Sequence, residues 1–294
     1  MIKDQVSKLL NGSAIDRNVK WIDPQFHRSS RSGITNGVKK FEGFRKGKHI
    51  RTTYLNYSRT GASISDGILF PQHNYKNKPS QIDDAISNID DGTKKADAIL
   101  ISTGANDVGW SETLINLATR VGDNRDPSGK THLELALENL DKKLVDLYDK
   151  FIQLDKKLRS ELLDSSGKIF ITEYPIDIFT ALDSKNQLIL KADCGFFEIL
   201  GMNSISKSEV NQLFQMGVKL NNKLKEFAEK LNWIYIGDIQ SSFSGHGYCS
   251  SDTFWVGAEE SCLNQDNFMG MLHPNSSGHE IIGDAVAKSL KSNL

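Results

Sequence analysis

The sequence lacks long apolar runs and an excess of charge of either sign. None of its apolar stretches approaches the ~18–20 residues needed to cross a bilayer, so we expect no membrane-spanning segment. Its 36 Lys and Arg residues nearly balance 37 Asp and Glu, and the net charge of −1 offers no basic footprint for nucleic acid. With 38% hydrophobic and 25% charged residues, the composition is that of a soluble globular protein, and small uncharged or weakly charged substrates fit it best.

Cysteine is also scarce. The three cysteines, Cys194, Cys249 and Cys262, show no Cys-x-x-Cys spacing and make a poor metal site, so we expect no metal. Cys249 and Cys262 either close a short disulfide loop ahead of residue 273 or remain two reduced, buried thiols. The sequence leaves both states open.

Strand and helix signals alternate along the chain without internal repeats, which is typical of a doubly wound α/β fold. Since α/β folds can reach this length as one unit, we expect a single domain over residues 1–294. Apolar residues at helical spacing predict helices covering the sheet over residues 82–89, 133–158 and 210–227. A coiled coil is the alternative for residues 133–158, but strands follow it directly. Residues 175–208 depart from compact strand-helix spacing and are predicted to form an inserted loop or lid.

The most informative segment is residues 98–107, in which an apolar run is followed by Gly104 and then by Asn106. Four apolar residues without polar alternation suit a parallel strand that is covered on both faces. Ligands in open α/β sheets bind outside the carboxyl ends of such strands, so the Asn106 side chain is expected where the chemistry occurs. An ordinary turn explains the same residues equally well.

A second signal lies near the C-terminus, where His273 is followed by Pro274 and then by a helical pattern from Ile281 to Leu290. A histidine on a short loop before a terminal helix is well placed to act as a general base, because its pKa leaves it mostly neutral near pH 7. The alternative is a loop histidine that only forms hydrogen bonds.

Together these two segments resemble the SGNH (GDSL-type) family of serine esterases and lipases. Residues 56–66 are similar to the second block of that family, and Gly61 matches the glycine that lends its N–H to the oxyanion hole. Two further stretches are similar to segments of one branch: residues 26–33, with Phe26 in place of a cysteine, and residues 246–249. The resemblance implies a three-layer, doubly wound (flavodoxin-like) parallel sheet, an oxyanion hole with Gly61 and Asn106, His273 as the base, and no cofactor.

The Gly-Asp-Ser block that carries the nucleophile of this family does not occur in the sequence. Residues 1–10 look like the segment that follows the block, so we expect the serine and the first strand to lie upstream of Met1. The 294 residues alone are then expected to be inactive. A serine-free relative and recruitment of another serine are the alternatives. The candidate serines are more easily explained as polar turn or cap residues: Ser29, Ser30, Ser58 and Ser63.

The acid partner also departs from the family pattern, because Gly270 stands where Asp is common, three residues before the histidine. Some group must accept the Nδ1–H of His273 if the other nitrogen is to face the nucleophile. Asp266 is the best carboxylate within residues 255–270, and a main-chain carbonyl is the close alternative. Asp107 is expected to be structural and to hold its turn through backbone hydrogen bonds.

The resemblance predicts hydrolysis of a small-molecule ester, an acylated glycan or a lipid. A non-catalytic glycan- or lipid-binding protein and an acyltransferase are the two alternatives. No signal peptide follows Met1, yet the branch implies that a secreted or cell-envelope location is plausible.

Overall fold

The computed structural model describes most of the chain and divides it into two compact units, which are treated separately. The sheet unit comprises residues 51–176 and 192–242, and the helix-pair unit comprises residues 1–50, 177–191 and 243–294. The single domain expected over residues 1–294 stays a prediction. The described residues are 21–23, 28–45, 48–75, 77–89, 94–110, 112–114, 128–183, 185, 187–190, 206–265 and 270–294.

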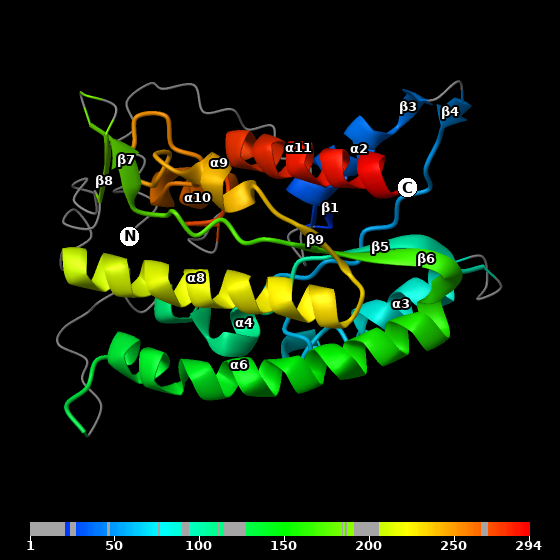
Figure 1. The fold of residues 1–294 in the computed structure, drawn as a ribbon, viewed down its shortest axis with the longest axis horizontal. Helices are drawn as coiled ribbons and strands as arrows, with labels where there is room; N and C mark the ends of the chain where they lie inside the picture. Colours follow the sequence, from blue (N-terminus) through cyan, green and yellow to red (C-terminus); the bar gives the residue numbers. More distant parts are fainter. Residues whose placement is uncertain are drawn as a thin grey trace. The chain divides into compact units, whose positions relative to one another are not determined.

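The sheet unit is built on a parallel sheet with strand order β5-β6-β9 (Figure 1). The strands are β5 (Ala96–Ile101), β6 (Leu163–Thr172) and β9 (Ile234–Ile236), and the parallel pairing of β5 with β6 confirms the parallel strand predicted before Asn106. Ile101 pairs with Ile171, and Ile171 pairs with Tyr235, so the carboxyl ends of all three strands lie at one edge of the sheet.

One expectation about β5 is corrected. The apolar run was predicted to be covered on both faces, yet residues 98–100 are only half-buried, and Ile101 alone in β5 is buried. The reason is its position, since β5 is an outer strand of the sheet within the described residues. The central strand β6 is covered in its C-terminal part, where residues 169–172 are buried.

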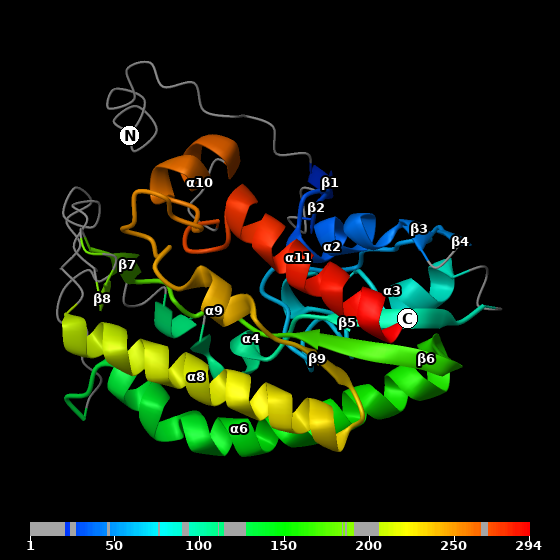
Figure 2. The ribbon, with the colours of Figure 1, turned by 45° about the horizontal axis from the view of Figure 1, so that its top comes forward.

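Local sequence explains where the two long helices of this unit begin. α6 (His132–Lys157) and α8 (Lys207–Lys230) each start with a capping box, formed by Thr131 with Glu134 and by Ser206 with Glu209. A single π turn, η3 (Leu158–Leu162), follows α6. Figure 2 shows α6 and α8 side by side.

The two helices run parallel to each other. Lys219 pairs with Asp141, and the Trp233 indole, which follows α8, donates to Asp155. The two residues of each pair are separated by the same number of positions, so both chain segments advance in the same direction. The apolar stripe predicted for α6 is buried, with Leu140, Leu147 and Phe151 at 0% exposure. Further helices are α3 (Gln81–Asn88), which confirms the prediction for residues 82–89, α4 (Ala105–Val108) and α9 (Ile239–Phe243), together with the 3-10 turn η1 (His73–Tyr75).

In the helix-pair unit, α2 (Gly33–Phe41) packs closely against α11 (Ser276–Asn293), the predicted terminal helix. Glycines allow this approach. A Cβ built on Gly37 would lie 2.4 Å from Cγ1 of Val286, and one on Gly283 would lie 2.8 Å from Cβ of Asn36. Side chains larger than hydrogen at these positions would force the helices apart.

Short elements complete this unit. The hairpins are β1 (Trp21–Asp23) with β2 (Arg28–Ser29), β3 (Gly43–Arg45) with β4 (Lys48–Ile50), and β7 (Thr180–Leu182) with β8 (Leu188–Leu190), and α10 (Ala258–Gln265) precedes the His273 loop. The third hairpin belongs to the predicted insertion over residues 175–208, of which residues 184, 186 and 191–205 lie outside the described residues. Its role as a lid stays a prediction.

The expected cysteine states are corrected. Cys249 is disulfide-bonded, whereas Cys262 is a free, buried thiol, so these two residues do not pair and are not both reduced. Cys194 lies outside the described residues. Within the part of the chain that is described, no helix is long and apolar enough to cross a membrane.

Candidate active site

The turn that carries Asn106 follows β5 directly. Gly104 begins it with a φ of 118°, which L-residues rarely adopt, and a Cβ there would lie 3.3 Å from the Leu224 side chain of α8. Gly109 ends α4 in the left-handed conformation. The Asn106 side chain is exposed at this edge, and its Nδ2 donates a hydrogen bond of 2.8 Å to the carbonyl of Ala62.

Gly61 lies on the loop that contains this acceptor. It is exposed and has a φ of 71°, a conformation that favours glycine. Gln72, which is buried, fixes the loop by donating from Nε2 to the carbonyl of Thr60 at 3.0 Å. No acceptor for the Gly61 N–H is found within the residues that the structure describes. The structure therefore places a free main-chain donor one residue before the carbonyl that Asn106 binds.

Asp107 joins the two segments. Its carboxylate accepts the main-chain N–H of Ile64 at 3.1 Å and 3.3 Å, and Lys150 of α6 lies 2.9 Å from Oδ1. Only 1% of the Asp107 side chain is exposed, whereas 32% of the Lys150 side chain is. Asp107 was expected to hold its own turn, but its carboxylate bonds to the neighbouring loop and to α6.

Tyr174 is a second support for the turn, and sequence analysis did not identify it. Its hydroxyl accepts the main-chain N–H of Ala105 at 3.4 Å. The pKa of Tyr174 is raised to about 12, because burial and, to a smaller extent, the Asp107 charge outweigh the lowering by hydrogen bonds from Ala105 and Ser102. The phenol is thus neutral at physiological pH. Asn221 of α8 in turn accepts from the Tyr174 N–H and donates to its carbonyl, both at 2.9 Å.

His273 lies in the helix-pair unit, on a strained loop. Leu272, the preceding residue, has a φ of 59°, which is unusual for a bulky side chain. The main chain is held by Val256, whose N–H donates to the His273 carbonyl at 2.8 Å and whose carbonyl accepts from Leu272. Nδ1 of the exposed His273 ring lies 3.2 Å from the carbonyl oxygen of Met271. Since a carbonyl only accepts, this contact assigns the proton to Nδ1 and leaves Nε2 as the basic nitrogen.

This carbonyl lies one residue beyond the range 255–270 in which an orienting group was expected. Asp266, the predicted carboxylate, falls outside the described residues. Gly270, at the position where the family commonly has an acid, donates its N–H to Ser261 Oγ at 2.9 Å and accepts the His273 N–H.

A second imidazole lies close to His273. His279, on the first turns of α11, accepts the Gly33 N–H at Nδ1 over 3.1 Å. The pKa of His279 is lowered to about 4, mainly by burial and also by charge repulsion from His273, and Glu280 opposes the shift. His279 is therefore neutral at pH 7.

Three of the four alternative nucleophiles have local side-chain partners. Ser58 Oγ donates to Asn56 at 2.7 Å, Ser29 Oγ accepts the Arg31 N–H, and Ser63 Oγ accepts the Asp66 N–H at 3.1 Å. These contacts are typical of turn and cap residues. Among the described residues, no three His, Cys, Asp or Glu side chains form a group that could hold a metal ion.

The structure thus brings Gly61 and Asn106 together in the sheet unit and describes His273 in the helix-pair unit. The predicted arrangement of all three around one cleft stays a prediction.

Known proteins resemble this chain in fold and in sequence family. The structure is similar to an extracellular lipase from Streptomyces rimosus, with a TM-score of 0.56 and 16% identity over 92% of this chain and 89% of the lipase. It is also similar to phospholipase A1 from Streptomyces albidoflavus NA297, with a TM-score of 0.55 and 14% identity over 94% of this chain and 92% of the phospholipase. These likenesses show the fold. No curated protein matches the sequence.

The family model of the GDSL-like lipases and acylhydrolases matches residues 23–286. The resemblance inferred from the sequence motifs is therefore confirmed, and the chain belongs to the GDSL-like lipase/acylhydrolase family.

Proposed function

We propose that this protein contributes the oxyanion hole and the general base of a serine ester hydrolase. In this reaction a serine attacks the ester carbonyl while Nε2 of His273 takes its proton. The negative charge on the carbonyl oxygen is held by the Gly61 N–H, the Asn106 side-chain amide and the N–H of the serine itself. Water then releases the acyl group, and no cofactor is required.

The joined Gly61 and Asn106 segments carry the proposal. Oxyanion stabilisation depends on donors that are fixed before the reaction begins, because donors that must reorient lose much of their effect. The Asn106–Ala62 bond and the Asp107–Ile64 bonds provide this rigidity. Nδ2 of Asn106 carries two hydrogens, and the Ala62 carbonyl takes one of them, so the second can serve an oxyanion.

The Met271 carbonyl supports the version in which the main chain orients His273. A carbonyl fixes the tautomer as a carboxylate would, but it carries no full charge and stabilises the imidazolium less. Asp266 remains the alternative partner. If the carbonyl is sufficient, Asp266→Asn changes turnover little, whereas a loss of several powers of ten would make Asp266 the partner.

The nucleophile is proposed to be the serine of a Gly-Asp-Ser block encoded upstream of Met1, on the first strand of a three-layer, doubly wound sheet. Family membership supports this assignment. The similarity to a lipase and a phospholipase supports a lipid ester or another acylated small molecule, such as an acylated glycan, as the substrate class.

Active-site labelling tests the proposal. We expect a fluorophosphonate to label the product of the full reading frame on the serine of the upstream block, and the same protein to hydrolyse short-chain p-nitrophenyl esters. The 294-residue chain should neither be labelled nor hydrolyse the esters. Labelling of an internal serine in the 294-residue chain, with ester turnover abolished by His273→Ala, would contradict the assignment of the nucleophile.

Two further outcomes separate the alternatives. A full-length protein that carries the upstream serine yet is not labelled would indicate a non-catalytic binding protein. Acyl transfer to an added alcohol in preference to water, measured by product analysis, would indicate an acyltransferase.

A further inference from the structure

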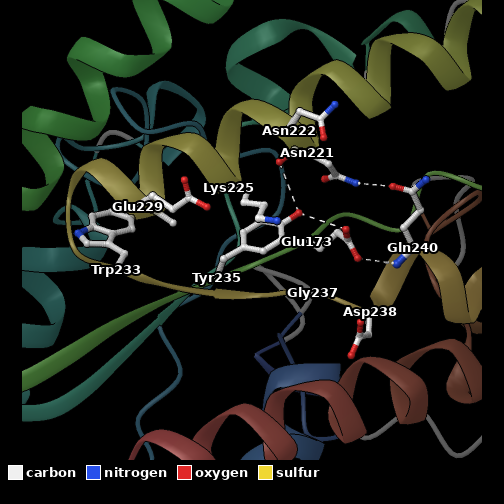
Figure 3. Close-up of a pocket in the computed structure, with 11 residues that line it drawn as sticks. Glu173, Asn221, Asn222, Lys225, Glu229, Trp233, Tyr235, Gly237, Asp238 and Gln240 are labelled. Carbon is white, nitrogen blue, oxygen red and sulfur yellow. Dashed lines mark hydrogen bonds between the residues drawn. The ribbon is translucent and has the colours of Figure 1, made fainter.

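A polar hollow of about 540 Å³ opens in the sheet unit between α8 and β9 (Figure 3). It contains neither Gly61 nor Asn106, and the proposed ester hydrolysis does not use its lining residues. Its volume lies within the range of small-molecule sites, roughly 300–1,000 Å³.

The floor of the hollow is held in place by hydrogen bonds, which are drawn in Figure 3. Glu173 accepts the Tyr235 hydroxyl at 3.2 Å and the Gln240 main-chain N–H at 2.8 Å. Asn221 donates to Oε1 of Gln240 at 3.3 Å, which leaves Nε2 of Gln240 as a donor. Burial and the Glu173 charge raise the pKa of Tyr235, so its hydroxyl stays protonated. These groups are preorganised because their positions do not depend on a ligand.

The rim offers both donors and acceptors on one face of α8. Asn222, Lys225 and Glu229 are exposed and follow each other at helical spacings of three and four residues. In the described part of the chain, none of these three side chains has a hydrogen bond or an ion pair. An amide, an ammonium group and a carboxylate are thus available to a ligand whose groups both donate and accept.

The Tyr235 ring provides an apolar surface beside these polar groups. A Cβ on Gly237 would lie 3.5 Å from Cε1 and 3.7 Å from Cδ1 of Tyr235, which is ordinary van der Waals contact. Glycine at this position therefore leaves that part of the ring uncovered. A flat C–H surface with hydroxyls at its edges would match an open aromatic ring that is flanked by hydrogen-bonding groups.

Other ligand classes fit less well. An acyl chain would bury the carboxylates, amides and ammonium group without partners, which is costly. An anion would meet the carboxylates of Glu173, Glu229 and Asp238 with only Lys225 to balance them.

We propose that this hollow is a saccharide-binding site. A neutral sugar ring lies against Tyr235, and its hydroxyls bond to Glu173, to Nε2 of Gln240 and to the α8 rim. Sugar binding here is separate from the proposed ester hydrolysis and does not depend on it, because it needs neither a nucleophile nor the oxyanion donors.

Saturation-transfer NMR on the 294-residue protein tests the site with a panel of glucose, galactose, N-acetylglucosamine, cellobiose and lactose. We expect saturable binding of at least one sugar, with the strongest transfer to its ring C–H protons. Gly237→Val should weaken this binding at least tenfold, since its side chain covers the Tyr235 ring. The φ of Gly237 lies outside the left-handed region, so valine introduces no backbone strain there.

Gly257→Val is the matched control, because a Cβ at Gly257 meets nothing within 4 Å, and it should bind sugar as the unaltered protein does. Asn222→Leu combined with Glu229→Leu removes rim groups without touching the floor and should also weaken binding. Failure of the whole panel to bind would overturn the proposal. Sugar binding that is unchanged by Gly237→Val would overturn it as well. Binding of decanoate or sulfate, and of no sugar, in the hollow would also overturn it.

Discussion

The carboxylate of Asp107 accepts the main-chain N–H of Ile64, at 3.1 Å from one oxygen and 3.3 Å from the other. The two residues are 43 positions apart in the sequence, and the bonds tie the loop of Gly61 to the turn of Asn106. Lys150 neutralises the buried carboxylate from α6. This arrangement fixes both proposed oxyanion donors.

Asp107→Asn should destabilise the protein by about 2–3 kcal/mol, because it removes a charged acceptor and leaves Lys150 without its partner. Chemical denaturation measures the change in the free energy of unfolding. Asp141→Asn is the matched control: Asp141 pairs with Lys219, but 78% of its side chain is exposed, so its loss should cost less than ~1 kcal/mol. Equal effects of the two variants would show that the Asp107 contacts do not hold the loops.

Gly37→Ala should destabilise the packing of α2 on α11 by about 1–3 kcal/mol, although alanine is the better helix former. The added Cβ would lie 2.4 Å from Cγ1 of Val286 and 3.0 Å from the Gly283 carbonyl. Thermal and chemical unfolding of Gly37→Ala, Val286→Ala and the double variant measure the coupling. We expect the double variant to be more stable than the sum of the single effects predicts. Simple additivity would argue against direct contact.

His279 should make stability fall with pH below neutrality. Its folded pKa of about 4 lies below the ordinary value of 6.5, so the unfolded chain binds a proton first as the pH drops. The contribution is complete above pH 6.5 and is lost as the pH falls toward 4. The pKa difference corresponds to a loss of up to about 3 kcal/mol.

Chemical denaturation of the unaltered protein and of His279→Asn across this pH range tests the assignment. Asparagine offers an oxygen in place of Nδ1 to the Gly33 N–H, but it does not titrate. The difference in stability between the two proteins should therefore depend on pH. A constant difference would mean that His279 does not contribute to the acid sensitivity.

The cysteine assignment predicts selective alkylation. In denatured, unreduced protein, iodoacetamide should label Cys262 and not Cys249. In the native protein Cys262 should react slowly, because only 7% of the residue is exposed. Peptide mass spectrometry locates the label, and alkylated Cys249 would disprove its disulfide.

The elements that the sequence predicted well are those with local signals. The capping boxes at Thr131 and Ser206 and the apolar stripe of α6 depend on residues within a few turns of each other. The strand before Asn106 was predicted because four consecutive apolar residues are followed shortly by a glycine. The exposure of β5 was not predictable, since burial depends on which strands lie beside it.

Within the candidate site, sequence motifs identified Gly61 and Asn106 but not what holds them. The partners of Asp107 are Ile64, 43 residues before it, and Lys150, 43 residues after it. Tyr174 is 69 residues from Ala105. The partner of His273 Nδ1 is the main-chain carbonyl of Met271. Every residue has such a carbonyl, so no residue type in the sequence predicts this contact. Such contacts follow from tertiary structure and carry no local pattern.

The most direct test of the account is the kcat of Asn106→Ala for a short-chain p-nitrophenyl ester, measured in the protein expressed from the full reading frame. Loss of one oxyanion donor should lower kcat by roughly 10²–10³-fold with little change in the free energy of unfolding. Asn139→Ala serves as the control and should retain full turnover, because it removes an exposed amide whose one bond within the described residues is to the Leu135 carbonyl. Equal kcat values for the two variants would contradict the assignment of Asn106 to the oxyanion hole.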